Sequence, residues 1–340
     1  MPQKRDRVLE SQMTRAEVSQ PESADKEPPK AVAAHSAAAG SQPDGSGAPG
    51  QRPRAPLGAT GRRLNSRIRK WIPSISRLTY NPLVKMVLGL FDILPKLIFR
   101  ELRGLPPNYM RVRIGVENRL FANQLIYLNR GKDLWLYAFS QGMCGLDSTI
   151  VEIGCGCGRR THHLRDLKVH SERFSGKYYG IDIDEEMLKW CRNNFDSKRF
   201  QFLGSTHDSK SYVNRSSTGG YYSIPLTDSS VDFVLATSLL THLLEDQMMN
   251  YFQESARMLR PGHFLAMTCF CLDYRPQTLG DRHSFQHQIG NAHVESLAQP
   301  EAAVAYTEAF LLDSAKRAGF SEARILHGET DTQHLLLCQK

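Results

Sequence analysis

The pattern of hydrophobic and polar positions divides the chain into three regions. Residues 1–63 hold almost no aromatic or branched apolar residues and are rich in Ala, Pro, Gly, Ser and charge. Such a segment cannot bury enough apolar surface to offset the entropy of ordering it, so we expect a disordered tail. Residues 64–104 interleave apolar with basic side chains, which is typical of a basic amphipathic helical arm. Residues 105–340 carry the regular pattern of one folded domain.

Within residues 105–340, strand-like and helix-like runs alternate. The proline-started segment 105–115 is expected to be extended, and a helix is expected over 117–142. Strands are predicted at 149–153, 178–183, 200–203, 231–236, 264–270, 323–326 and 334–337, and helices at 160–167, 185–194, 245–259 and 306–318. This alternation predicts an α/β fold with a mostly parallel sheet, helices on both faces and ligands at the carboxyl ends of the strands.

The arm leaves two interpretations open. Its prolines at 73, 82 and 95 are expected to break it into short helical pieces. The arm then packs on the later domain or on a second subunit of a homodimer. Alternatively, residues 64–103 lie on an anionic membrane, as basic amphipathic segments do. We favour packing, because short pieces cannot present a continuous apolar face.

The run TIVEIGCGCGRR, residues 149–160, carries the chemistry. A β-branched strand ends in an acid, three glycines alternate, and a helix follows. Glycines there allow a sharp turn and a close approach of the backbone to a ligand, and the helix start offers free N–H groups. A dinucleotide fingerprint would need its third glycine at Arg159, so the nicotinamide pattern fails.

The pattern Glu-x-Gly-x-Gly-x-Gly resembles the first motif of class I S-adenosylmethionine-dependent methyltransferases. The resemblance implies a Rossmann-like sheet and S-adenosylmethionine as the cofactor. It also implies that Glu152, Gly154, Cys155, Gly156 and Gly158 bind this cofactor. A non-catalytic scaffold that only binds the cofactor or a partner is an alternative function. The presence of Glu152 and of all three loop glycines argues against it.

The second strand of the domain ends in Asp182, Ile183 and Asp184. In the family that the chain resembles, an acid at this place holds the two ribose hydroxyls, a task that suits a carboxylate. We assign this role to Asp182, with Ile183 beside it, and expect Asp184 to cap the helix that starts at Glu185. An adenine contact is expected soon after the third strand. In the family, an acid at this place binds the adenine amino group. The aligned position holds Thr206, which is not an acid, so we assign the adenine contact to Asp208, two residues further on.

A third block, IPLTDSSVDFVLATSLLTH over residues 224–242, resembles the fourth strand of the family and the loop that faces the transferred methyl group. Thr237 is expected to bind the cofactor there. His242 is the candidate catalytic base, because its pKa lies near working pH. The run ARMLRPGH, residues 256–263, resembles the following helix-to-strand turn, with Pro261 and Gly262 ending the helix.

Outside this core, the arrangement over residues 105–338 resembles bacterial methyltransferases that act on sugars or other small molecules. That resemblance depends on Leu105-Pro106-Pro107 with Arg111, Arg113 and Gly115, and on the run TSLLTH at 237–242. It implies a small-molecule acceptor, most simply a sugar or glycan hydroxyl. The runner-up is a lipid or quinone acceptor at a membrane.

Charge and cysteine content narrow the partners. Residues 1–113 carry 20 Lys and Arg against 9 Asp and Glu, whereas the rest carries 23 against 26. A near-neutral domain argues against a nucleic-acid substrate. The seven cysteines form no Cys-x-x-Cys pair, so we expect a reducing, cytoplasmic location, with any membrane contact peripheral at the inner face.

No metal is expected. His283 and His287 have His-x-x-x-His spacing with His293 nearby, but the glutamate of a zinc-protease helix is missing. The surroundings of these histidines predict a polar loop. In that loop they are either solvated or part of a wall of the acceptor site.

Overall fold

The computed structural model describes residues 75–115, 121–205, 222–274, 283–327 and 333–340. All of them belong to the compact unit Gly58–Lys340. The expected tail, residues 1–63, and the first part of the arm, residues 64–74, lie outside the described residues.

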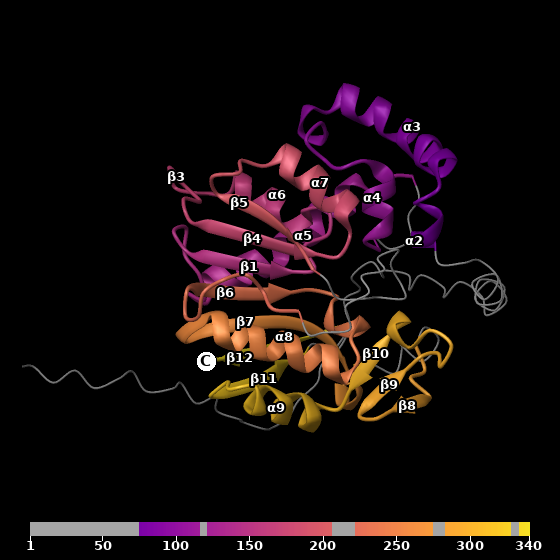
Figure 1. Ribbon diagram of the computed structural model, residues 1–340. Coiled ribbons are helices and arrows are strands. Elements are labelled where there is room, and N and C mark those ends of the chain that lie inside the picture. Colours follow the sequence, from indigo (N-terminus) through magenta and orange to yellow (C-terminus); the bar gives the residue numbers. More distant parts are fainter. Residues whose placement is uncertain (1–74, 116–120, 206–221, 275–282, 328–332) are drawn as a thin grey trace, which may run out of the picture. The chain divides into compact units, whose positions relative to one another are not determined.

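A large sheet forms the centre of the described structure. Strand β1 (Thr149–Ile153) lies between β4 (Lys177–Asp182) and β6 (Val231–Ala236) and runs parallel to both (Figure 1). The chain order reverses at this point, since β4 leads to one edge of the sheet and β6 to the other. Ligands of open α/β sheets bind beyond the carboxyl ends of the strands at such a point.

The outer strands complete the sheet. Strand β5 (Phe200–Gly204) pairs in parallel with β4, and β7 (Leu259–Cys271) pairs in parallel with β6. Strand β12 (His334–Gln339) is antiparallel to β7 and to β11 (Glu322–Leu326). The sheet is therefore mostly parallel with an antiparallel end.

Helices cover both faces of this sheet. Buried apolar residues of α5 (Gln124–Ser140), α6 (Arg159–Asp166) and α7 (Glu185–Asn194) pack in one cluster against one face. Residues of α8 (Glu245–Met258) and α9 (Glu308–Arg317) pack in a second cluster against the other. The predicted Rossmann-like α/β fold is confirmed.

The N-terminal elements differ from the prediction. The segment expected to be extended contains α4 (Asn108–Arg113), which starts directly after Pro107. Proline is tolerated before the first helical turn, whose N–H groups need no helical partner. The arm contains α2 (Ile75–Leu78) and a continuous helix α3 (Pro82–Ile98). Pro82 starts α3 after the break that separates it from α2, as expected. Pro95 lies inside the last turn of α3, so the expectation that this proline also breaks the arm is wrong.

Two later segments also differ. The expected polar loop contains a hairpin of β8 (His287–Ile289) and β9 (Ala292–Val294), which joins the sheet through β10 (Val304–Tyr306). These strands are three residues each, too short for a clear alternation in the sequence. A separate small hairpin is formed by β2 (Lys168–Val169) and β3 (Glu172–Arg173).

The turn before β7 is tighter than expected. Helix α8 ends at Met258, and buried Leu259 already pairs with Val231 of β6. The chain thus enters the sheet before Pro261, which does not end the helix. Gly262 has a φ of +80° and donates its N–H to the carbonyl of Lys340 at 2.8 Å.

Candidate active site

The glycine loop connects β1 to α6 with three residues in the left-handed region. Gly154, Gly156 and Gly158 have φ values of +78°, +54° and +74°. Residues with a Cβ rarely adopt this region, so the loop depends on glycine at all three places. Gly158 directly precedes α6, whose first N–H groups lie at the carboxyl edge of the sheet.

Asp182 is fixed against this loop at the end of β4. Its Oδ2 accepts the N–H of Gly156 at 2.7 Å, and its Oδ1 accepts the N–H of Asp184 at 2.9 Å. The carboxylate is half-buried, and burial raises its pKa to about 6 although both backbone N–H groups act in the other direction. Each oxygen keeps a further lone pair, so the group can still accept two hydroxyl hydrogen bonds. Ile183, also half-buried, follows it.

Glu152 lies beneath the loop and is 1% exposed. It accepts the hydroxyl of Tyr178 at 2.5 Å, and Arg160 Nη1 lies 3.8 Å from its Oε1. Burial raises the pKa of Glu152, while Arg160 and Tyr178 oppose that rise. These contacts link the end of β1 to β4 and α6, so the side chain holds the two flanks of the loop together.

Cys155 contributes packing and backbone to the loop. It is buried, and its thiol donates to the carbonyl of Gly156 at 3.7 Å. Burial raises the pKa of Cys155 well above its ordinary value, so the thiol stays neutral. A Cβ added at Gly180 would lie 2.9 Å from this sulfur, which explains why β4 carries a glycine beside the loop.

Helix α4 and the residue after it cover the loop from the N-terminal side. A Cβ added at Gly156 would lie 2.9 Å from Cγ2 of Ile114. Arg113 is buried and pairs with Asp184 at 2.7 Å and with Glu186 at 3.0 Å. Tyr80 also donates its hydroxyl to Asp184 at 2.7 Å. Sequence reasoning singled out Arg113 by resemblance but missed this contact, because its partners lie far along the chain.

Asp184 has the capping role that the sequence predicted. Its Oδ1 accepts the N–H groups of Glu186 and Met187 at 3.1 and 3.2 Å. Its other oxygen receives the contacts of Arg113 and Tyr80. One carboxylate therefore starts α7 and attaches the N-terminal elements beside the site.

The loop after β6 lies next to the glycine loop. A Cβ added at Gly154 would lie 3.6 Å from the Cβ of Leu239. Thr237 is buried at the start of this loop, and Ser238 has a φ of +55°. The N–H of Ser238 is held by Thr268 Oγ1 at 2.7 Å. Such a conformation in a residue with a Cβ stores strain, which is common at functional sites.

His242 lies at the end of the short helix η2 (Leu240–His242) in the same loop. Its Nδ1 is 2.8 Å from the carbonyl oxygen of Glu301. A carbonyl can only accept, so Nδ1 carries the proton and Nε2 is the basic nitrogen. Burial lowers the pKa of the half-buried ring, which keeps it neutral at neutral pH.

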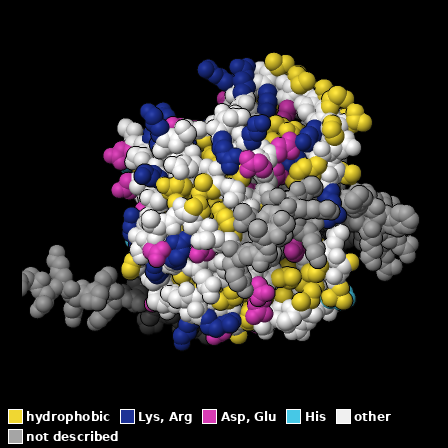
Figure 2. Space-filling view, viewed as in Figure 1, with side chains coloured by type: hydrophobic (Ala, Val, Ile, Leu, Met, Phe, Trp, Pro, Cys, Tyr) yellow, Lys and Arg dark blue, Asp and Glu magenta, His cyan; other side chains and the backbone are white. Residues whose placement is uncertain are grey.

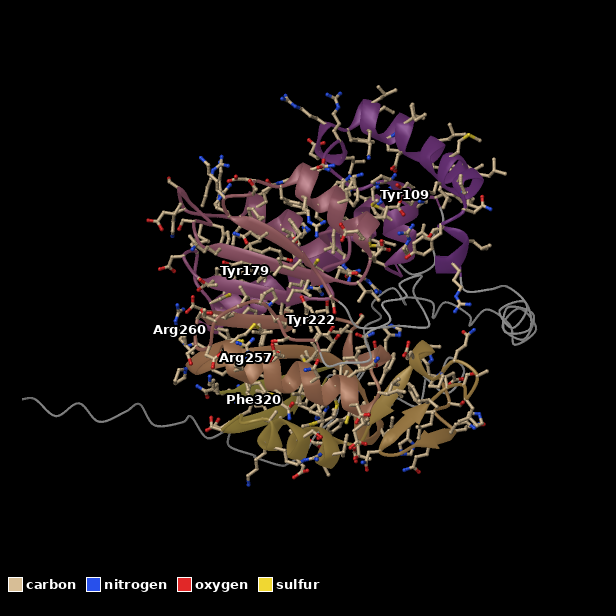
Figure 3. The ribbon with its side chains drawn as sticks, in the orientation of Figure 1. Tyr109, Tyr179, Tyr222, Arg257, Arg260 and Phe320 are labelled. Atoms are coloured by element: carbon tan, nitrogen blue, oxygen red, sulfur yellow. The ribbon has the colours of Figure 1, made fainter. Side chains whose placement is uncertain are left out.

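The structure thus brings most predicted residues to one edge of the sheet. Asp208 lies in the segment 206–221, outside the described residues. The two flanks of that segment are joined by a hydrogen bond: Tyr222, labelled in Figure 3, donates its hydroxyl to the carbonyl of Gly204 at 3.1 Å.

The late histidines point in different directions, since His287 pairs with Val294 and His293 with Gln288, which places the two histidines on opposite faces of one hairpin. His287 lies on exposed β8 and His293 on β9, while the rings of His283 and Phe270 are 5.2 Å apart. In the described part of the chain, no group of three His, Cys, Asp or Glu side chains could hold a metal ion.

Comparison with known proteins agrees with this geometry. Residues 151–267 match the family model described as a methyltransferase domain. The chain is 26% identical over 175 residues to the biotin biosynthesis bifunctional protein BioHC of Teredinibacter turnerae. That match covers 51% of this chain and only 28% of the relative.

Among solved structures, a Methanosarcina mazei S-adenosylmethionine-dependent methyltransferase has a TM-score of 0.43 and 19% identity, covering 60% of this chain and 97% of its own. A protein from Pyrococcus horikoshii has a TM-score of 0.45 and 16% identity, covering 63% and 91%.

The glycine cradle, the strand-end carboxylate and the family match together define the class of the domain. The chain carries a class I methyltransferase domain, and its cofactor is S-adenosylmethionine. The donor set fits this cofactor, since Asp182 offers acceptors for a diol and the loop offers backbone without Cβ atoms.

Proposed function

We propose that the enzyme transfers a methyl group to a hydroxyl of a small-molecule acceptor, such as a sugar or glycan. The observation that supports this proposal is the neutral imidazole of His242, in the loop beside the glycine cradle. Its Nδ1 donates to the carbonyl of Glu301, which leaves Nε2 as the basic nitrogen. A hydroxyl must lose its proton during methyl transfer, and a positioned histidine can accept it.

The chain's own residues divide the work. S-adenosylmethionine supplies an electrophilic methyl group when it is bound. Asp182 would accept the ribose hydroxyls, and the backbone of Gly154–Gly158 would hold the cofactor. Glu152 keeps the loop in place through Tyr178 and Arg160. Ile183, Asp208 and Thr237 complete the proposed cofactor contacts. Because the donor is already reactive, the main contributions are orientation and removal of one proton.

The acceptor class follows from charge and surface. Residues 114–340 carry 23 Lys and Arg against 26 Asp and Glu. A nucleic-acid acceptor would require a basic face, so a small molecule fits better. A lipid or quinone at a membrane surface is the second candidate, favoured by the exposed apolar face of α3. A cytoplasmic location, peripheral at the inner membrane face in the second case, belongs to the same proposal.

A labelling experiment tests the reaction and its base together. Purified protein and methyl-labelled S-adenosylmethionine are incubated with a fractionated metabolite extract, in aqueous and lipid-soluble fractions. His242→Gln should abolish most labelling while cofactor binding, measured by calorimetry, stays unchanged. His287→Gln on exposed β8 is the matched control and should label normally. Labelling that is equal in both variants would refute the role of His242, and labelling of nitrogen or carbon would refute O-methylation.

A further inference from the structure

Helix α3 is amphipathic, but its apolar face points to solvent and its polar face points toward the domain. Only Leu88 and Asp92 of its side chains are buried. Ten large apolar side chains are each 43–68% exposed: Leu83, Met86, Val87, Leu90, Phe91, Ile93, Leu94, Leu97, Ile98 and Phe99. Those within the helix lie on one continuous arc of roughly 160°, opposite Asp92. A surface helix ordinarily turns its apolar stripe toward the core, and here it is turned outward.

The polar face of α3 attaches it to the rest of the domain. Asp92 pairs with the buried guanidinium of Arg111 at 2.5 Å and accepts the N–H of Asn108 at 2.8 Å. Lys85 pairs with Glu186 at 2.6 Å, and Tyr109, labelled in Figure 3, donates to the same glutamate at 3.2 Å. These polar contacts hold the helix in place, together with Phe91 at the edge of the apolar face, whose ring centroid lies 4.3 Å from that of Phe121. That face is therefore available to something outside the described structure.

The exposed face is too large to be incidental. The ten side chains present on the order of 1,000 Å² of apolar surface, whereas the largest apolar patch of an ordinary monomer is about 300–600 Å². Figure 2 shows hydrophobic side chains gathered along the outer rim of α3, with Lys and Arg nearby. None of the described helices is long and apolar enough to cross a membrane. An apolar helix face of this kind can instead lie in the plane of a lipid surface.

The charges around the face select the occupant. Exposed Arg77 precedes α3, and exposed Arg100 and Arg103 follow it, with Glu101 as the exposed acid among them. In the whole segment 64–103, eight Lys and Arg stand against two acids. A two-fold contact between antiparallel copies of α3 would bring Arg77 of one copy near Arg100 and Arg103 of the other, which is repulsive. Anionic lipid head groups complement the cations at the two ends of α3.

We propose that α3 is a membrane-docking helix, which inserts its outward apolar face into the interface of an anionic lipid bilayer while the basic residues at its two ends contact the head groups. The proposal concerns attachment and does not depend on which acceptor is methylated.

Vesicle co-sedimentation of the full chain tests it. The probes are vesicles of phosphatidylcholine alone and of phosphatidylcholine with phosphatidylglycerol. The wild type should sediment with the anionic vesicles. Leu97→Glu should weaken partitioning onto the vesicles by about tenfold or more, since a leucine is lost from the face that inserts into the lipid. Leu136→Glu on α5 is the matched control, because Leu136 is 67% exposed and Leu97 is 66% exposed. The control should bind like the wild type.

Charge and fold are tested separately. Arg100→Gln with Arg103→Gln should weaken binding to anionic vesicles by about fivefold per arginine, with little effect on neutral vesicles. Leu97→Glu and Leu136→Glu should keep the wild-type melting temperature, because both side chains are exposed. The double arginine variant should lower it slightly, because Arg103 donates to the carbonyls of Lys96 and Leu97. Wild type that fails to sediment, or Leu97→Glu that binds as well as Leu136→Glu, overturns the proposal. A dimer in analytical ultracentrifugation that Leu97→Glu dissociates would assign the face to a second copy instead.

Discussion

Asp182→Asn should affect stability and cofactor affinity differently, and the stability effect should depend on pH. Burial raises the pKa of this carboxyl from its ordinary value of 3.8 to about 6. The folded state therefore holds the proton more tightly than the unfolded state. In the wild type, stability is lost as pH rises from about 4 through about 6, because the carboxylate must then ionise in a partly buried place.

The size of this effect follows from the pKa. A rise from 3.8 to about 6 corresponds to about 3 kcal/mol when the group is fully ionised. Solvent near the half-buried carboxylate reduces this to roughly 1–2 kcal/mol over the range from about pH 4.5 to about pH 7.5. Asparagine does not ionise, so the variant avoids this loss. It forfeits one of the two accepted N–H bonds, about 1 kcal/mol, at every pH.

Thermal unfolding of the wild type and of Asp182→Asn, without cofactor, at about pH 4.5 and about pH 7.5 measures this effect on stability. The melting temperature of the variant minus that of the wild type should become more positive by roughly 2–8 °C on going to the higher pH. Cofactor affinity at neutral pH should fall about 10- to 100-fold, because charge-assisted bonds to the ribose are lost. Asp184→Asn is the control: it weakens the contact with Arg113 and should lower the melting temperature at both pH values. A melting-temperature difference for Asp182→Asn that stays constant with pH would refute the argument.

Four further outcomes are expected. Gly156→Ala should lower cofactor affinity and stability more than Gly154→Ala, because its Cβ lies 2.9 Å from Ile114, against 3.6 Å from Leu239 for Gly154; adding Ile114→Ala should restore only the part due to this contact. His242→Gln should reduce kcat by about 10²–10⁴. In the wild type, kcat should rise as pH increases through a value below 6.5 and then stay level, because burial lowers the pKa of His242; a rise only above pH 7 would contradict this. Deletion of residues 1–63 should leave the melting temperature nearly unchanged, as differential scanning calorimetry can check.

The core of the fold was predictable because its signals are local. The β-branched run before the glycine loop matched β1 residue for residue, and helix α7 began where Asp184 was expected to cap it. The three loop glycines indicated left-handed backbone, and all three adopt it. Patterns of this kind depend on neighbours in the sequence, so a single sequence carries them.

The N-terminal elements were harder to predict because their partners are distant. The proline-started segment 105–115 was expected to be extended, yet it contains α4, and its Arg111 and Arg113 are both buried. Their partners are Asp92 on α3 and Asp184 at the start of α7. Ion pairs between residues so far apart leave no periodic trace in the sequence. Pro95 misled in the other direction, because α3 continues through it to Ile98 although a proline removes the N–H that would bond to the carbonyl of Phe91.

The outward apolar face of α3 bears on the choice between a soluble sugar and a lipid or quinone as the acceptor. A packing arm would be neutral between a sugar and a lipid, but α3 turns its apolar face away from the domain. The same N-terminal elements contact the site, since Ile114 lies against Gly156 and Arg113 binds Asp184. A lipid surface bound by α3 would therefore be connected to the carboxyl edge of the sheet through one short, buried segment. Docking on a membrane is of most use to an enzyme whose acceptor resides there. For that reason vesicle binding, if it is observed, would move the lipid or quinone acceptor ahead of the soluble sugar.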